Sequence, residues 1–306
     1  MSSDRAGAWR AFLRAANGLA AHRAEVLWAR SCAAVNLLRL TRHTPRWSSP
    51  GRQRVMVIAP HPDDELGCAG TLIRHRDAGD QVRIVTLTDG HLSRAYGFDG
   101  PSIAERRREE AVEAASRMGA ELLWLGLPEG DWQPEAGEHA LRRALVETAP
   151  SVVYAPSIVD YHPEHRRVAR TLAAALRQAA PVEIRVYAIQ VPLTPLLVNL
   201  VHDVSDLAPA IRRAYAAHAS QRQTTANMMR LKRYAARLYG APALAEAFCA
   251  MPSRLYADLQ RTDAAPKFRG LYPRAWTDPL AALAGWRERI AWRRALRQSE
   301  AAPPPA

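Results

Sequence analysis

The stretch Val55-Met-Val-Ile-Ala-Pro-His61-Pro-Asp63-Asp64-Glu65 joins an apolar run to a dense cluster of charge. Its first part has the composition of a buried strand, and one imidazole and three carboxylates follow within five residues. Carboxylates at such short spacing repel one another, and burying them is costly. The cluster therefore either faces water in a loop or surrounds a positive charge.

Outward from this stretch, apolar runs alternate with helical patterns as far as residue 190. Short apolar runs of this kind are typical of strands that helices cover on both faces. We therefore expect an α/β fold with a doubly wound, Rossmann-like, mostly parallel sheet. In such sheets ligands bind beyond the carboxyl ends of the strands, where the charge cluster lies. The predicted strands are 55–58, 82–87, 122–125, 152–154 and 184–189, and the predicted helices are 66–78, 102–118, 136–148 and 164–179.

Three regions of the chain differ in composition. Residues 1–53 are predicted to form a basic helical extension that ends in a linker, and residues 54–250 are predicted to form the α/β domain. Residues 251–306 are predicted to form a second basic helical extension, with a disordered tail rich in Ala and Pro. Helices outside the alternating pattern are expected at 5–42, 207–239 and 279–298.

The bulk properties argue against several classes of protein. The 306 residues are 48% apolar, which is ordinary for a globular chain. Cys32, Cys68 and Cys249 lie far apart, which argues against a disulfide framework and against a zinc site built from cysteines. No apolar run approaches the length of a membrane span, and arginines interrupt the N-terminal region where a signal peptide needs an apolar segment. We therefore expect a cytoplasmic protein.

The net charge of +12 is concentrated in the flanks. Residues 1–53 contain nine basic and two acidic residues, and residues 191–306 contain 17 basic and 8 acidic ones. Residues 54–190 contain 16 basic and 20 acidic residues and are therefore acidic. A nucleic-acid-binding protein would spread basic residues over its main domain, so we expect no nucleic-acid partner.

A second polar cluster, Asp-Tyr-His-Pro-Glu-His at 160–165, follows the predicted strand 152–154. In the first cluster, His61 and Asp64 are three residues apart and can converge on one ion. Zinc at catalytic sites usually takes three nitrogen or oxygen ligands from the protein and leaves one position for water. The second cluster can supply the third ligand, because its two histidines can face the same cleft from a helix that begins at Pro163.

Each cluster also has a structural interpretation. The first can be a solvated loop whose acidic residues, Glu65 among them, cap the following helix. In the second, His162 and His165 can be two surface histidines at the start of a helix. Both clusters together, at the carboxyl ends of parallel strands, favour the metal site.

The two clusters resemble the main motifs of the PIG-L/LmbE-like family of zinc-dependent de-N-acetylases. Pro60-His-Pro-Asp-Asp-Glu65 is similar to the family's Ala-His-Pro-Asp-Asp-Glu, with proline in place of alanine. His162-Pro-Glu-His165 is similar to the later His-Pro-Asp-His, with Glu164 in place of aspartate. The resemblance covers about residues 54–250. It extends to less specific patterns at Arg107–Gly119, Gly126–Gly130, His218–Gln221 and Glu246–Phe248.

The resemblance implies a hydrolase that removes an acetyl group from an N-acetylated amino sugar. It implies that His61, Asp64 and His165 bind Zn²⁺. Asp63 would then be the general base, and His162 would polarise the carbonyl or donate a proton. The chemistry agrees, because amide hydrolysis needs an activated water and zinc lowers the pKa of a bound water to roughly 7.

Four further residues are candidates for substrate binding. Arg107 can bond a sugar hydroxyl or a phosphate, and the alternative is a solvated position in a helix rich in Arg and Glu. Glu129 and Asp131 follow a predicted strand and can bind sugar hydroxyls, and the alternative is a polar turn. His91 follows another strand, and its role stays open. Three other histidines are expected to be structural: His75, His202 and His218.

We therefore expect a Zn²⁺-dependent deacetylase of an N-acetylglucosamine-type glycoconjugate or glycolipid. One alternative is an amidase that acts on a different amide, such as a thiol conjugate. Another is a membrane-peripheral or nucleic-acid-binding protein that keeps an inactive metal fold.

The basic flanks raise the question of a membrane partner. Aromatic residues beside arginines on a helix suit peripheral contact with an anionic membrane. The alternative is that both flanking helices pack on the acidic domain. The residues concerned are Trp9, Phe12 and Leu13 in the first flank and Trp286, Ile290, Arg293 and Arg297 in the second.

Overall fold

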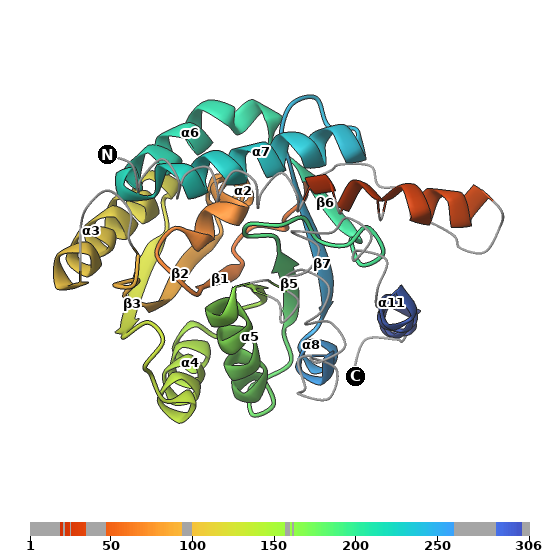
Figure 1. Cartoon of the computed structure of the whole chain (residues 1–306). Helices are drawn as coiled ribbons and strands as arrows, with labels where there is room; N and C mark the ends of the chain where they lie inside the picture. Colours follow the sequence, from red (N-terminus) through yellow and green to blue (C-terminus); the bar gives the residue numbers. More distant parts are fainter. Residues whose placement is uncertain are drawn as a thin grey trace.

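Figure 1 shows the computed structural model, which describes residues 19–20, 22–24, 26–34, 47–93, 100–156, 160, 162–259 and 286–301. Helices cover both faces of a seven-stranded sheet, so the predicted α/β fold is confirmed. Several sequence predictions lie outside the described residues: those for Trp9, Phe12 and Leu13, for the linker residues 43–46, and for the tail residues 302–306.

The sheet is mostly parallel, with strand order β3-β2-β1-β4-β5-β7-β6. The five predicted strands are present and parallel, and their apolar residues are largely buried between two layers of helices. At one edge, β7 runs antiparallel to both of its neighbours, β5 and β6. The bounds are β1 (Arg54–Ala59), β2 (Gln81–Thr88), β3 (Glu121–Leu127), β4 (Val152–Ala155), β5 (Glu183–Tyr187), β6 (Leu200–Asp203) and β7 (Ala245–Pro252).

The direction of winding reverses between β1 and β4, which are neighbours in the sheet. From β1 the chain runs outward through β2 and β3, and it then returns to β4 on the other side of β1. Loops that leave β1 and β4 therefore diverge and open a crevice at the carboxyl ends of these strands. The two polar clusters of the sequence follow these two strands.

The helices form two layers, one on each face of the sheet (Figure 1). One layer holds α2 (Ala69–Asp77), α3 (Gly100–Met118), α6 (Ala208–Ala217) and α7 (Arg222–Tyr239). The other holds α4 (Pro134–Thr148), α5 (Pro163–Leu176), α8 (Ser253–Leu259) and α11 (Trp286–Ala301). The described residues 22–24 and 26–34 are also helical and are called the N-terminal helix. Short 3₁₀ turns occur at η1 (Asp64–Cys68), η3 (Ser205–Leu207) and η4 (Ala219–Gln221).

The helical segment predicted at 207–239 is present but is divided in two. The chain forms α6 and α7, and the helix is interrupted at His218, which has φ −84° and ψ 62°. His218 is fully buried and its Nε2 lies 2.8 Å from Oε1 of Glu65, so a tertiary contact overrides the local helical pattern. Strands β6 and β7 were not predicted either, because β6 has only four residues and β7 contains three alanines, which have a weak strand preference.

Both flanks have residues buried against the domain, and His22 is one of them in the first flank. In α11, Trp292, Arg293 and Leu296 are buried, and Arg293 donates a hydrogen bond to the carbonyl of Leu196 (2.9 Å). The C-terminal helix therefore packs on the domain, as the alternative to membrane contact predicts. Among the described residues, no helix has the combination of length and apolar character that crossing a membrane requires.

Candidate metal centre

The charged cluster after β1 folds into a tight turn that leads into η1. The amide of His61 donates to Oδ2 of Asp64 (2.8 Å), and the amide of Asp64 donates to the carbonyl of His61 (3.2 Å). His61, Asp63, Asp64 and Glu65 are each at most 6% exposed. The interpretation as a solvated loop is therefore wrong, and three buried carboxylates require compensating positive charge.

The second cluster lies at the start of α5. His162 is the N-cap residue, and its Nδ1 accepts a hydrogen bond from the amide of Glu164 (3.3 Å). Pro163 occupies the first helical turn as predicted, and His165 follows in that turn and is fully buried. The amide of His162 donates to Oδ1 of Asp160 (2.9 Å). His165 is therefore not a surface histidine.

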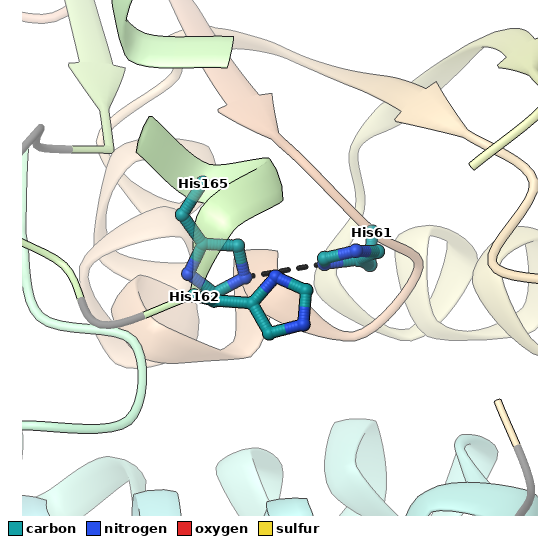
Figure 2. Close-up of side chains that lie close together, drawn as sticks. All are labelled: His61, His162 and His165. Carbon is teal, nitrogen blue, oxygen red and sulfur yellow. Dashed lines mark hydrogen bonds between the residues drawn. The ribbon is translucent and has the colours of Figure 1, made fainter. Parts of the chain in front are cut away.

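Three donor atoms from the two clusters form a compact triangle. Nδ1 of His61 lies 3.0 Å from Oδ2 of Asp64 and 3.1 Å from Nε2 of His165, and these last two atoms are 3.1 Å apart. Figure 2 shows the rings of His61 and His165 facing each other, with His162 beside them. Nitrogens of the three imidazoles lie within 4.8 Å of one another.

Both histidines of the triangle have a carboxylate at their other ring nitrogen. Nε2 of His61 lies 3.0 Å from Oε1 of Glu129. Nδ1 of His165 lies 3.1 Å from Oδ2 of Asp160, although the N–H is not well aligned with that oxygen. A carboxylate in this position fixes the proton on the far nitrogen and leaves the lone pair of the near nitrogen free for a metal.

The donor set fits a metal ion such as zinc. Two imidazole lone pairs and a carboxylate oxygen that face one another repel unless a proton or a cation lies among them. Ligand atoms about 2.0–2.1 Å from a tetrahedral zinc ion are roughly 3.3–3.4 Å apart, close to the separations in the triangle. His61, Asp64 and His165 are thus the residues that would hold the ion.

The electrostatics of the triangle also favour positive charge. Burial by itself lowers the pKa of His61, but the bonds to Asp64 and Glu129 raise it to about 9. Burial likewise opposes protonation of His165, yet Asp64 and Asp160 raise its pKa well above the ordinary value. The carboxylates around the triangle therefore stabilise a cation at this point.

Asp63 is held apart from the triangle by its backbone and by an arginine. Its φ of 110° lies in the left-handed region, which costs an L-residue about 1–3 kcal/mol and separates its side chain from that of Asp64. Oδ1 of Asp63 lies 3.0 Å from Nη2 of Arg107. Burial raises the pKa of Asp63 to about 7, although Arg107 opposes the shift.

Arg107 is 4% exposed, so the solvated alternative is wrong. Besides Asp63, it donates to the carbonyls of Pro62 (2.5 Å) and Gly90 (3.1 Å). A side chain on Gly90 would collide with the guanidinium, and Gly90 has φ +69°, so glycine is required here for two reasons. The guanidinium thus binds the turn that carries Asp63.

Glu65 supports the same turn from the other side. Its Oε2 accepts a hydrogen bond from the amide of Asp63 (3.0 Å), and its Oε1 lies 2.8 Å from Nε2 of His218. Burial lowers the pKa of His218, but the Glu65 carboxylate raises it above the ordinary value overall. The break between α6 and α7 is therefore part of the support for the site.

The structure separates the other predicted substrate-binding residues. Glu129 contacts His61, and its amide donates to Oδ1 of Asp89 (3.1 Å). Nδ1 of His91 lies 2.8 Å from the same Asp89 oxygen, with the ring partly exposed, whereas Asp131 is exposed. Glu129 and His91 are thus linked through Asp89, and Asp131 has no described contact with them.

Sequence reasoning missed several residues of this site. Asp160 and Asp89 each follow a predicted strand, and that position was the signal that could have found them. Trp132 left no such signal. Its Nε1 donates to Glu164, and the guanidinium of Arg167 stacks 4.1 Å from its ring centre. Trp132 thereby ties the loop after β3 to the start of α5.

The chain is similar to several known proteins. The sequence model of the PIG-L family, described as GlcNAc-PI de-N-acetylase, matches residues 56–176, which include both clusters. The diacetylchitobiose deacetylase of Thermococcus kodakarensis is 32% identical over 124 residues. A probable N-acetyl-alpha-D-glucosaminyl L-malate deacetylase of Bacillus anthracis is 30% identical over 137 residues.

These matches are partial in length. They cover 37% and 40% of this chain and 45% and 59% of the two relatives, so the chain spans about half the length of the curated relatives it matches. A solved structure, a conserved protein from Thermus thermophilus, is matched more fully. It is 30% identical, with a TM-score of 0.54, and the match covers 64% of this chain and 93% of the other.

Proposed function

The chain belongs to the PIG-L family, and from that premise we propose that it is a zinc-dependent hydrolase of N-acetylated amino sugars. It would remove the acetyl group from an N-acetylglucosamine-type glycoconjugate by attack of water on the amide. Its named relatives are deacetylases of substrates that contain N-acetylglucosamine. The observation that carries the proposal is the triangle of His61 Nδ1, Asp64 Oδ2 and His165 Nε2, with Asp63 beside it.

Three residues would hold the zinc ion: His61, Asp64 and His165. When bound, zinc supplies a water of lowered pKa and a Lewis acid for the acetyl carbonyl. With the ion bound, His61 and His165 would be neutral and would face it with their near nitrogens, and Glu129 and Asp160 would favour the protons on the far nitrogens.

Asp63 would be the general base. Its carboxylate lies next to the ligand Asp64 but is turned away by the positive φ, so it can accept the proton of the attacking water. Arg107 fixes its orientation through the contact at 3.0 Å. After attack, the carbon–nitrogen bond breaks, and the same proton can pass from Asp63 to the leaving amine.

His162 would stabilise the oxyanion. Burial and the neighbouring His165 and His61 lower its pKa to about 3, so its ring is neutral at physiological pH. Because Nδ1 accepts a hydrogen bond from Glu164, the neutral ring carries its proton on Nε2. An N–H at that position can donate to the developing oxyanion of the acetyl carbonyl.

The test is release of acetate by the zinc-loaded protein. The panel contains N-acetylglucosamine glycosides, the corresponding glycolipids and an N-acetylated thiol conjugate, and a chelator-treated sample is the control. We expect acetate from the amino sugars and none from the control. Turnover of the thiol conjugate alone would favour the alternative amidase, and no acetate from any compound at full zinc occupancy would contradict hydrolase activity on these amides.

We also propose peripheral contact with anionic membranes through the N-terminal helix. Leu27 and Trp28 are 64% and 46% exposed, and Arg23 and Arg30 are exposed near them. Aromatic and basic residues together suit the interface of an anionic bilayer. Sedimentation with anionic vesicles should show binding that weakens with salt and is reduced by Trp28→Ser. Equal sedimentation with neutral vesicles would contradict the proposal.

A further inference from the structure

The loop that follows β2 lies between two loops of the candidate metal centre. In the sheet, β2 has β1 on one side and β3 on the other (Figure 1). At its carboxyl end, the amide of Thr88 donates to the carbonyl of Pro60 (3.1 Å), and the amide of Asp89 donates to the carbonyl of Leu127 (2.9 Å). The backbone of Asp89 is therefore fixed between the turn that follows β1 and the loop that follows β3.

One oxygen of the Asp89 side chain has partners in two loops. Its Oδ1 accepts a hydrogen bond from the amide of His91 (3.1 Å) and lies 2.8 Å from Nδ1 of the same residue. The same oxygen accepts a hydrogen bond from the amide of Glu129 (3.1 Å), 40 residues later. Aspartate commonly bonds the amide two residues on to form a local turn. The bond to Glu129 lies outside that turn, so turn formation alone does not account for Asp89.

Through Glu129, Asp89 is connected to the metal centre. The amide of Glu129 is bonded to Asp89, and its Oε1 lies 3.0 Å from Nε2 of His61. The bond to Asp89 thus holds the backbone from which the Glu129 carboxylate reaches the imidazole. Carboxylates that bond the far nitrogen of a ligand histidine fix the orientation of the ring and raise the affinity for the metal. Two successive hydrogen bonds therefore join Asp89 to a proposed zinc ligand.

Through His91, Asp89 also fixes a partly exposed imidazole. An ionised carboxylate only accepts hydrogen bonds, so a neutral His91 ring carries its proton on Nδ1 and has an acceptor at Nε2. The backbone beside this ring is tied to the proposed general base, because Arg107 donates both to the carbonyl of Gly90 and to Asp63. His91 therefore stands on a loop that is bonded to the catalytic turn, and its Nε2 can accept a hydrogen bond from a hydroxyl.

We propose that Asp89 is a positioning residue that fixes Glu129 for the metal centre and His91 for the substrate. The inference rests on the proposed deacetylase function and adds one recognition contact, in which Nε2 of His91 accepts a hydrogen bond from a hydroxyl of the amino-sugar substrate. Asp89 acts only through its two partners. Its replacement should therefore weaken zinc binding through Glu129 and raise KM through His91.

The first measurement is zinc affinity, determined by competition with a chromogenic chelator, which needs no substrate. Loss of a residue that bonds a ligand histidine costs on the order of 10–100-fold in metal affinity, and we expect this for Glu129→Ala. Asp89→Ala should weaken zinc binding by about threefold to tenfold, because Glu129 stays but is less well held. Asp89→Asn keeps an acceptor oxygen and should restore most of the affinity. In the Glu129→Ala background, Asp89→Ala should cause no further loss.

The matched control is Asp203→Ala at the opposite edge of the sheet. Asp203 ends β6, and its Oδ1 accepts a hydrogen bond from the amide of Ser205 (2.9 Å), so the substitution removes the same kind of turn. It should leave zinc affinity unchanged, and thermal melting establishes that each variant is folded. If Asp89→Ala does not fold, Asp89→Ser can still form the turn but has a shorter side chain. Equal zinc affinity in wild type and the Asp89 variant, or an equal loss in the control, would overturn the inference.

The second measurement is KM at saturating zinc, for the N-acetylglucosamine glycoside that releases acetate fastest. His91→Ala should raise KM by about threefold to tenfold, with less effect on kcat, since it removes one hydrogen bond to the substrate. Asp89→Ala should raise KM by a similar factor and add nothing in the His91→Ala background. Additive increases in KM would overturn the inference. If no glycoside releases acetate, the proposed deacetylase function fails, whereas the zinc titration still decides whether Asp89 acts through Glu129.

Discussion

Two buried histidine clusters in this domain have similar composition but differ in how their ring nitrogens are used. In the first, Nδ1 of His75 lies 2.6 Å from Oδ2 of Asp80, and Nε2 lies 2.8 Å from Oη of Tyr154. In the second, His61 and His165 each have one ring nitrogen near a carboxylate, Glu129 or Asp160. The other ring nitrogen of each belongs to the triangle and faces its other two atoms. The first cluster is complete within the protein, whereas the second would be completed by a cation under the proposed function.

The pKa directions separate the two clusters in the same way. Burial lowers the pKa of His75, and Asp80 does not fully restore it, so His75 is neutral at physiological pH. The pKa values of His61 and His165 are raised although these side chains are buried too. Whether both nitrogens of a buried histidine have protein partners is therefore a better guide to its role than burial itself.

The largest expected difference between the clusters is in metal binding. His61→Ala or His165→Ala removes one of three ligands, so we expect the zinc content to fall from about one ion per chain to near zero and activity to be lost. His75→Ala should retain the ion, because His75 faces Asp80 and Tyr154. Elemental analysis after dialysis measures this, and a full zinc complement in either ligand variant would refute the assignment.

A smaller effect is expected from a substitution within the metal centre at a residue that is not a proposed ligand. Asp63→Asn keeps the side-chain volume but removes the proton acceptor, so zinc should stay bound while kcat falls on the order of 10²–10⁴-fold. Asp77→Asn, an exposed carboxylate on α2, is the matched control and should leave kcat unchanged. Wild-type turnover by the Asp63 variant would show that another group accepts the proton.

The smallest expected effect is on the stability of the folded protein when the His75 cluster is disrupted. His75→Gln leaves Asp80 and Tyr154 without their imidazole partner, which should cost about 1–3 kcal/mol in the free energy of unfolding. Because the pKa of His75 is lower in the folded state, the unfolded state binds more protons as pH falls through about 6.5. The difference in the free energy of unfolding between the wild type and the variant should therefore become smaller as the pH falls from 7.5 to 5.5.

Urea unfolding at these two pH values measures this effect, with zinc content as the control. The variant should retain its zinc, since the cluster holds no ligand. A stability difference that grows on acidification would contradict the assignment of His75 as neutral in the folded protein.

The sequence predicted the parts of the molecule that depend on local pattern. The five parallel strands were found because each is a short apolar run between helical segments, and the helix start at Pro163 followed from its fixed φ. The placement of both clusters at the carboxyl ends of β1 and β4 followed from the same reasoning. These features are determined by residues that are neighbours along the chain.

The features that the sequence did not reveal depend on contacts between distant residues. Arg107 lies in a charged run that is typical of a solvated helix, yet it is buried against Asp63, 44 residues away. Glu65 looks like a helix cap, but its partner is His218, 153 residues later. Local patterns cannot specify such pairs, because the two residues come into contact only when the sheet has assembled.

The capping of α2 has a consequence for the order of folding. Cys68, at the N-cap position, makes no side-chain cap bond, and the amides of Gly70 and Thr71 donate instead to Glu246 of β7 (2.9 and 2.8 Å). During translation, the two polar clusters of the candidate metal centre leave the ribosome before this carboxylate is synthesised. Until β7 inserts, the first turn of α2 lacks its acceptors, which costs about 1 kcal/mol or more. The first turn of α2, which follows η1 directly, is therefore capped only after β7 has joined the sheet.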